Sequence, residues 1–318
     1  MRFLFVMDPP ETMTADKDTT FAFLRGAGAL GHHSFHCLTR DVSLCGPRGF
    51  ATARPISVQD SRPYVSVGDA ERFDVTSFDA IFIRKDPPFD AAYLYLTQQL
   101  DCVKDQVLVV NDPRGIRDAN EKLFAFRFHE YTPRSLVSAE RSEILEFVRD
   151  VGGSAVLKPL DGAGGSGVVT LTLADRHARS LVDIWTHEGK RLAIVQEYQA
   201  AVRVGDKRVL VLDGQPLGAI LRVPREDDVR ANIHAGGSVQ PTELTPKERA
   251  IVNAVGVQLV EYGLYFVGLD FIGEKLIEVN VTSPTGLQEL ARFQGRPVEQ
   301  DVIRWVVGKV EGKARRHA

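Results

Sequence analysis

Val267-Gly-Leu-Asp270-Phe-Ile-Gly-Glu-Lys-Leu-Ile-Glu278-Val-Asn280-Val-Thr-Ser-Pro-Thr-Gly286 is the stretch that decides the fold of this chain. Apolar residues alternate with small or polar ones on either side of Gly273-Glu-Lys275, which is typical of two strands joined by a turn. If the two apolar sets share one face, Phe271 lies level with Ile277, which requires a three-residue turn. A two-residue turn would send one apolar set to the wrong face.

The same register predicts a group of oxygen ligands on the polar face of this hairpin. Asp270 lies opposite Glu278, and Asn280 follows two residues on. Two carboxylates and an amide oxygen suit Mg²⁺, which usually takes one or two carboxylates and leaves its other positions to phosphates and water. A solvated sheet face would show the same alternation, so the hairpin alone leaves both interpretations open.

The composition narrows the class of protein. A chain of 318 residues with 44% hydrophobic content can bury the cores of two or three domains. Its net charge of −3 and the absence of a long basic block argue against a nucleic-acid partner. The apolar runs are strand-sized, so we expect no membrane span and no signal peptide. The three cysteines, Cys37, Cys45 and Cys102, lack paired spacing, which favours a reduced, cytoplasmic protein.

The first third of the chain predicts an open α/β domain that begins with a βαβ unit. The expected elements are a strand at Phe3–Met7, a helix at Thr19–Leu30 and a strand at Ser34–Leu38. Residues 41–75 are polar and irregular, with only weak strands. A further strand, Ala80–Arg84, runs into Lys85-Asp-Pro-Pro88, so a basic pair lies at the carboxyl edge of the sheet, where such folds bind ligands. A surface loop is the alternative.

A glycine-rich segment, Pro159-Leu-Asp-Gly-Ala-Gly-Gly-Ser-Gly167, lies between two predicted strands. A dinucleotide fingerprint would be followed by a helix, and a Walker loop would end in Gly-Lys-Ser/Thr, so neither fits. A flexible hairpin tip of this kind has free backbone N–H groups that can fold over phosphates. Lys158 enters the tip between two apolar neighbours, and a phosphate would supply the partner that a buried ammonium needs. A surface hairpin without a ligand is the alternative.

The second half of the chain predicts a strand pair, a loop and a helix before the hairpin. The strands are Gly205–Leu212 and Ala219–Val223, and residues 224–241 have the composition of a mobile loop. Thr245-Pro-Lys-Glu248 forms a capping box for a helix over residues 246–262.

These pieces, in this order, resemble the ATP-grasp superfamily and, within it, the prokaryotic glutathione synthetase family. The matching runs span nearly the whole chain: Val6-Met-Asp-Pro9, Arg84-Lys-Asp-Pro-Pro-Phe-Asp90, Asn120-Glu-Lys-Leu-Phe124, Leu157-Lys-Pro-Leu-Asp-Gly162, Gly205-Asp-Lys-Arg-Val-Leu-Val211, Phe266-Val-Gly-Leu-Asp270 and Glu278-Val-Asn-Val-Thr-Ser-Pro-Thr285. The resemblance implies a mixed α/β (α+β) architecture in three parts. These are an open α/β preATP-grasp domain at 1–118, an ATP-grasp lid subdomain at 119–190 and a catalytic subdomain at 191–318.

The resemblance also implies an activity, the ATP-dependent ligation of γ-glutamylcysteine with glycine to give glutathione, ADP and phosphate. A free carboxylate reacts poorly with an amine, so ATP would first convert it to an acyl phosphate, a transfer that depends on positioning and charge neutralisation. ATP and Mg²⁺, or Mn²⁺ in its place, would be required. No nucleic acid or membrane is implied, and the family suggests a cytoplasmic homo-oligomer, either a tetramer or a dimer.

The resemblance assigns the candidate site residues to four groups. The metal ligands are Asp270, Glu278 and Asn280. The catalytic residues are Arg208 and Arg222. They would face the transferring phosphoryl group and the tetrahedral oxyanion, which a permanently charged guanidinium can stabilise. The nucleotide-binding residues are Lys122, Lys158, Gly162, Gly164, Gly165, Ser166, Gln196, Glu197, Tyr198, Asp206, Arg230 and Asn232. The substrate-binding residues are Arg84, Ser283, Thr285 and Gly286.

Other interpretations remain open at this point. Another ATP-grasp carboxylate–amine ligase would share the metal and nucleotide residues and differ at Arg84, at residues 224–241 and at Ser283–Gly286. The chain departs from the family at Ala231, where glycine is usual, and this bears on the acceptor more than on ATP chemistry. A nucleotide-binding regulator would have lost metal ligands or arginines that this chain keeps. A Rossmann oxidoreductase is disfavoured by the strand after the glycines.

Overall fold

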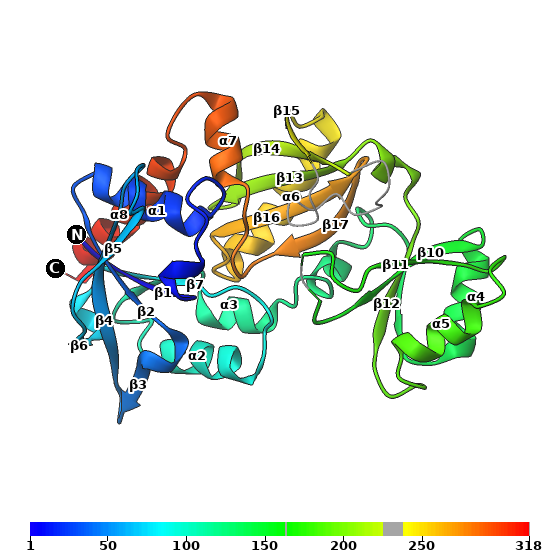
Figure 1. Ribbon diagram of the computed structural model, residues 1–318, viewed down its shortest axis with the longest axis horizontal. Helices are drawn as coiled ribbons and strands as arrows, with labels where there is room; N and C mark the ends of the chain where they lie inside the picture. Colours follow the sequence, from blue (N-terminus) through cyan, green and yellow to red (C-terminus); the bar gives the residue numbers. More distant parts are fainter. Residues whose placement is uncertain (163, 225–237, 318) are drawn as a thin grey trace.

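The computed structural model describes residues 1–162, 164–224 and 238–317. Its strands form three sheets, of eight, four and five strands. Figure 1 shows the N-terminal sheet and the four-stranded sheet at opposite ends of the molecule, with the five-stranded sheet between them. The mixed α/β architecture expected from the sequence is confirmed.

The N-terminal domain is built on a parallel core of buried strands. β1 (Arg2–Met7) pairs in parallel with β2 (His33–Cys37) and with β7 (Ala80–Arg84), and β8 (Leu108–Val110) extends the sheet. Helix α1 (Thr19–Ala29) begins after Asp18, whose carboxylate accepts from the first backbone N–H groups of the helix. The remaining helices of this domain are α2 (Ala91–Asp101) and α3 (Pro113–Asp118).

Residues 41–75, expected to hold only weak strands, form a regular antiparallel extension of this sheet. β4 (Arg48–Val58) pairs with β2 and is the longest strand of the domain. It also pairs with β3 (Val42–Cys45), β5 (Val65–Val67) and β6 (Glu71–Asp74). Exposed polar residues on the outer face hide the strand pattern in the sequence, because only alternate residues such as Ala51 and Ala53 are buried.

The four-stranded sheet is a separate antiparallel unit with its own apolar core. Its order is β11-β10-β12-β9, and the strands are β9 (Ser135–Ser138), β10 (Ser154–Pro159), β11 (Val169–Thr172) and β12 (Ala193–Glu197). Helices α4 (Arg141–Asp150) and α5 (Ala178–Trp185) cover one face (Figure 1). The boundary predicted between residues 190 and 191 falls just before β12, which pairs with β9 and β10 in this sheet.

The five-stranded sheet is antiparallel throughout and carries the hairpin with which the sequence analysis began. Its order is β15-β14-β13-β16-β17, and the strands are β13 (Asp206–Leu212), β14 (Gln215–Val223), β15 (Ser238–Thr242), β16 (Phe266–Ile272) and β17 (Lys275–Asn280). The helices that follow or interrupt these strands are α6 (Pro246–Glu261), α7 (Leu287–Gln294) and α8 (Glu299–His317). The capping box at Thr245 and Glu248 is confirmed.

The hairpin confirms one predicted pairing and corrects the turn. Asp270 lies opposite Glu278, as expected. Phe271 lies level with Leu276 rather than Ile277, so only two residues form the turn and the three-residue turn was wrong. A β-bulge accounts for the extra residue, because two residues of β17 face one position of β16. The bulge lets Leu276 enter the core while Ile277 turns toward a cavity.

Packing ties the hairpin to the N-terminal domain. A single cluster of buried apolar residues includes Val6 and Ile83 of the N-terminal sheet and Val209 and Leu269 of the five-stranded sheet. The amide of Asn111 donates to the carbonyl oxygens of residues 266 and 281 and accepts from the backbone of residue 266. Helix α8 returns to pack on α1 (Figure 1). Among the described residues, no helix has both the length and the apolar content that a bilayer crossing demands.

Candidate active site

A cavity of about 130 Å³ lies between the four-stranded and five-stranded sheets. It brings together every predicted nucleotide-binding residue that the structure describes. These are Lys122, Lys158, Gly162, Gly164, Gly165, Ser166, Gln196, Glu197, Tyr198 and Asp206. The other two predicted nucleotide residues, Arg230 and Asn232, lie outside the described residues, as does most of the predicted mobile loop.

Part of the wall of this cavity, which is the smaller of two at the site, is apolar. Val156 reaches it from β10, and Val168 reaches it from the residue just before β11. Ile272 and Ile277 reach it from the hairpin. Val156 faces the cavity because its neighbours in β10 alternate toward the core of the four-stranded sheet. Ile277 faces it because of the bulge. The sequence analysis did not predict these apolar residues, because a face turned to a cavity and a face turned to a core show the same alternation.

Two lysines enter the smaller cavity with different partners. Lys122 lies 3.1 Å from Glu278 and also donates to the backbone oxygen of Gly162. Lys158 donates to the side-chain oxygen of Gln196 at 2.9 Å and has no ion-pair partner within the described ranges. Burial lowers the pKa of Lys158, since the charged form loses hydration that no carboxylate replaces. An anionic ligand would restore that balance.

The glycine-rich tip has left-handed backbone at three of its glycines. Gly164, Gly165 and Gly167 all have positive φ angles, between 61° and 77°, which side-chain-bearing residues rarely adopt. Gly164 and Gly165 line both this cavity and a second, larger one. The tip therefore lies where a bound group could pass from one cavity to the other.

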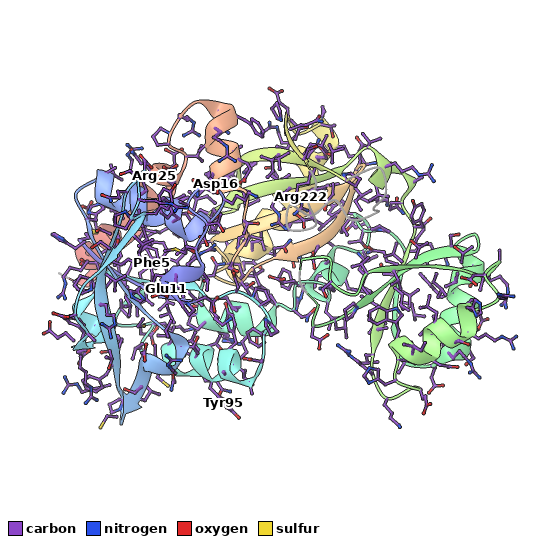
Figure 2. The ribbon with its side chains drawn as sticks, in the orientation of Figure 1. Phe5, Glu11, Asp16, Arg25, Tyr95 and Arg222 are labelled. Atoms are coloured by element: carbon purple, nitrogen blue, oxygen red, sulfur yellow. The ribbon has the colours of Figure 1, made fainter. Side chains whose placement is uncertain are left out.

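Between the cavities, Arg208, Arg222, Asp206 and Asp270 form a buried charge cluster. Arg208 holds Asp270 with two hydrogen bonds, of 2.8 and 2.7 Å. Arg222 lies 2.9 Å from Asp270 and 2.5 Å from Asp206. Burial alone would raise the pKa of Asp270, but the two guanidinium groups lower it below the usual range. Figure 2 labels Arg222 on the five-stranded sheet.

The three predicted metal ligands lie together on one face of the hairpin. Asp270 pairs with Glu278 across the strands, and the amide of Asn280 donates to Asp270 at 3.1 Å. Asp270 lines the smaller cavity, Asn280 lines the larger one and Glu278 lines both. No three His, Cys, Asp or Glu side chains of the described chain gather as a metal cluster. The set of two carboxylates and one amide nonetheless fits Mg²⁺, which takes few protein ligands when phosphates supply the rest.

The larger cavity, of about 900 Å³, opens at the carboxyl edge of the N-terminal sheet. Arg84 lines it, with hydrogen bonds to Thr20 at 3.1 Å and to the backbone oxygen of Pro284 at 3.3 Å. Within the described residues Arg84 has no carboxylate partner, and burial lowers its pKa. A buried guanidinium without a counterion is suited to a ligand carboxylate.

The predicted substrate residues after the hairpin separate into two kinds. Ser283 and Thr285 line the larger cavity, and Thr285 lies 3.3 Å from the guanidinium of Arg208. Gly286 does not line it. Its φ of 107° starts helix α7, and a Cβ there would come within 2.8 Å of Ile220, so its role in the structure is conformational.

Several polar residues of the larger cavity were absent from the predicted site, and Glu121 is the one beside the predicted metal ligands. Glu121 lines its wall, and its carboxylate accepts from the backbone and side chain of Thr282. The sequence offered one signal, its place between Asn120 and Lys122 in a run that matched the family. Position alone did not reveal which way the carboxylate points.

Comparison with known proteins gives consistent matches over nearly the whole chain. The family model "Prokaryotic glutathione synthetase, N-terminal domain" matches residues 1–117, and "Prokaryotic glutathione synthetase, ATP-grasp domain" matches residues 121–295. A curated protein of Gloeobacter violaceus named "Glutathione synthetase" is 42% identical over 314 residues, covering 96% of this chain and 97% of that protein. One of Agrobacterium fabrum with the same name is 41% identical over 293 residues, covering 92% of each.

Solved structures show the same fold at lower identity. D-cycloserine synthetase DcsG has a TM-score of 0.64 at 15% identity, covering 96% of this chain and 99% of that one. The ATP-grasp ligase PsnB, complexed with a precursor peptide and AMPPNP, has a TM-score of 0.62 at 15% identity, covering 97% and 98%. At such identities the likeness extends to the fold alone.

Proposed function

From the premise that this chain belongs to the prokaryotic glutathione synthetase family and is an ATP-dependent ligase, we propose how its two cavities divide the reaction. ATP occupies the smaller cavity, and γ-glutamylcysteine and glycine occupy the larger one. The observation that carries this assignment is the charge cluster of Arg208, Asp270 and Arg222, which lies where the two cavities meet.

In the smaller cavity the nucleotide is held by both charge and apolar contact. Lys158 and Lys122 bind the phosphates, and the glycine tip closes over them and excludes water, which would hydrolyse an acyl phosphate. Lys158 is suited to this role because its hydrogen-bond partner is the neutral amide of Gln196, so no carboxylate of the described residues balances its charge. The adenine lies against the apolar wall, and the backbone at Gln196–Tyr198 reads its edge. Arg230 and Asn232 are proposed as nucleotide contacts on the family resemblance alone.

Mg²⁺, or Mn²⁺ in its place, is held by Asp270, Glu278 and Asn280. When bound, it neutralises the charge of the β- and γ-phosphates. The proposal is supported by the position of these side chains at the junction of the cavities and by the low pKa of Asp270, which keeps that carboxylate ionised.

Arg208 and Arg222 stabilise negative charge as it develops. The carboxylate of the dipeptide attacks the γ-phosphorus of ATP, which releases ADP and leaves an acyl phosphate. The neutral amine of glycine then adds to the acyl carbon and its nitrogen gives up one proton to solvent, and phosphate leaves as the tetrahedral oxyanion collapses to the amide. Asp270 and Asp206 already orient both guanidinium groups, so little reorganisation is needed when the charge appears.

In the larger cavity, Arg84 pairs with a substrate carboxylate, and Ser283 and Thr285 contact the substrates near the reacting centre. Arg84 is suited because it is buried without a counterion among the described residues. Gly286 supports the site indirectly, through the backbone turn that starts α7.

The setting of the enzyme is proposed separately. We place it in the cytoplasm as a homo-oligomer, a tetramer or a dimer. Support for the compartment comes from Cys37, Cys45 and Cys102, which form no disulfide. Support for assembly comes from the family resemblance. Cell fractionation and light scattering on a sizing column test these two statements.

The deciding experiment supplies purified protein with ATP, Mg²⁺, γ-glutamylcysteine and glycine, and follows phosphate release and the product mass. We expect glutathione with one phosphate released per product, and little turnover when either amino substrate is left out. Faster turnover with an acceptor other than glycine would reassign the enzyme to another ligase of the same fold.

A further inference from the structure

Glu121 lies in the larger cavity beside the proposed metal ligands and has no role in the reaction described above. We infer that its carboxylate binds the ammonium group of the acceptor amino acid. This inference rests on the proposed function, because it assumes that the acceptor enters the larger cavity and reacts beside the metal hairpin.

The first observation is that Glu121 is fixed in place by the segment that leaves the hairpin. Its Oε1 accepts hydrogen bonds from the backbone N–H of Val281 at 3.1 Å, the backbone N–H of Thr282 at 3.3 Å and the hydroxyl of Thr282 at 2.8 Å. Its backbone oxygen accepts from the N–H of Val279 at 3.0 Å. The carboxylate therefore has one orientation, and that orientation is set by residues on both sides of Asn280.

The second observation is that the other carboxylate oxygen is left over. Within the described chain, Oε2 of Glu121 takes part in no hydrogen bond and no ion pair. It is also reachable, since it is not among the buried polar atoms that lack a partner. Glu121 thus presents one unpaired carboxylate oxygen to the cavity from a rigid support.

The other carboxylates of the cavity wall are engaged or lie elsewhere. Asp8 pairs with Lys85, Glu289 with Arg292 and Glu278 with Lys122. Asp86 accepts from Ser283, and Asp18 caps helix α1. Of these residues only Glu278 belongs to the hairpin that Glu121 contacts, and Glu278 is a proposed metal ligand.

Substrate chemistry explains why an anionic oxygen is needed at this point. Glycine arrives with a carboxylate and an ammonium group, and the cavity wall already offers cations to carboxylates through Arg84, Arg208 and Arg222. A carboxylate next to the metal ligands supplies the complementary charge close to where the amine must react. It also directs the nitrogen of glycine, rather than its carboxylate, toward the reacting centre.

The test compares two acceptors in wild-type enzyme and in Glu121→Gln. Hydroxylamine is a small amine without the charge of an ammonium at neutral pH, and it converts an acyl phosphate into a hydroxamate with release of phosphate. Glutamine keeps the shape of the side chain and the acceptor oxygen that Val281 and Thr282 use, and it replaces the free oxygen with an amide nitrogen. Thermal unfolding confirms that the variant is folded.

We expect Glu121→Gln to raise the KM for glycine about 10- to 100-fold, the range for losing a hydrogen bond to a charged group. The KM for ATP and for γ-glutamylcysteine and the rate of hydroxamate formation should stay within about twofold. The matched control is Glu248→Gln, at a buried glutamate that also accepts from a backbone N–H but lies outside both cavities. It should leave the glycine-to-hydroxylamine ratio unchanged.

Equal losses with both acceptors would overturn the inference, because Glu121 would then act only through the hairpin and the metal ligands. An unchanged KM for glycine would overturn it as well. The proposed function is tested separately, by the wild-type enzyme: if that enzyme forms hydroxamate but does not ligate glycine, both the acceptor assignment and the inference fail.

Discussion

The charged face of the five-stranded sheet and the tip of the four-stranded sheet both bury cationic side chains, but they balance the charge in different ways. On the charged face, Arg208 and Arg222 are held by Asp270 and Asp206 without any ligand. At the tip, Lys158 is buried with only an amide oxygen for a partner, and the adjoining glycines have left-handed backbone. The arginines are therefore paired before any substrate binds, whereas Lys158 and the glycine tip lack an anionic partner until a ligand supplies one.

This difference indicates a division of labour. Catalysis gains most from charges that need not move when the transition state forms, and paired arginines meet that need. Binding and release of a nucleotide need a region with its own core that can move, and the four-stranded sheet has a separate apolar cluster. Mutations in the first region should therefore alter turnover, and mutations in the second should alter nucleotide affinity.

The largest effect is expected from Asp270→Asn. The variant loses a proposed metal ligand and the carboxylate that both guanidinium groups contact, which leaves Arg208 without its ion-pair partner, so turnover should fall at least about 100-fold. Steady-state glutathione formation at saturating Mg²⁺ measures it. Asp206→Asn is the matched control and should lower turnover less, because Arg222 is the one ion-pair partner of Asp206 among the described residues. Equal losses in the two variants would mean that the cluster acts as a charge network and that Asp270 has no special role at the metal.

A smaller effect, confined to binding, is expected from Lys158→Met. The side chain keeps its length and apolar stem but loses the charge offered to phosphate, so the Kd for ATP should rise about 10- to 100-fold. Isothermal titration with ATP measures this, and turnover at saturating ATP should change much less. A variant with normal ATP affinity and low turnover would place Lys158 with the catalytic residues.

The same lysine should make ATP binding depend on pH. Burial lowers its pKa, so the folded protein releases this proton at a lower pH than an ordinary lysine would. ATP affinity should therefore weaken as the pH rises, and the loss should begin below the pH at which an ordinary lysine is neutralised. Lys158→Arg keeps its charge in this range and should flatten the profile. An equally steep profile in that variant would assign the pH dependence to another group.

Local patterns in the sequence predicted part of the candidate site, and the family resemblance supplied the other residues. Alternation placed Asp270 opposite Glu278, and the glycine run after Lys158 indicated a tip and a buried cation. The structure brings every described residue that was predicted to bind the nucleotide to one cavity. It also pairs Asp270 with Glu278 as expected.

What the sequence could not provide depends on tertiary packing. The bulge in β17 is invisible locally, because Leu276 and Ile277 are both apolar and either could enter the core. The length of β4 is hidden by its exposed polar face. The orientation of Glu121 depends on Thr282, a residue 161 positions away. In each case, contacts between distant segments decide between local alternatives of similar free energy.

The smallest effect on activity is expected at the bulge, where two neighbouring side chains have separate functions. Leu276 is fully buried in the core that joins the hairpin to the N-terminal domain, whereas Ile277 is only partly buried and lines the nucleotide cavity. Leu276→Ala should lower the free energy of unfolding by about 2–5 kcal/mol, because it opens a cavity in packed core. Ile277→Ala should leave stability nearly unchanged and raise the KM for ATP about threefold to tenfold, since it removes apolar contact with the base. Chemical denaturation and steady-state kinetics on both variants measure the two effects. The three-residue turn expected from the sequence would give the reverse pattern, with Ile277 as the stability residue, so this pair tests whether the bulge exists in solution.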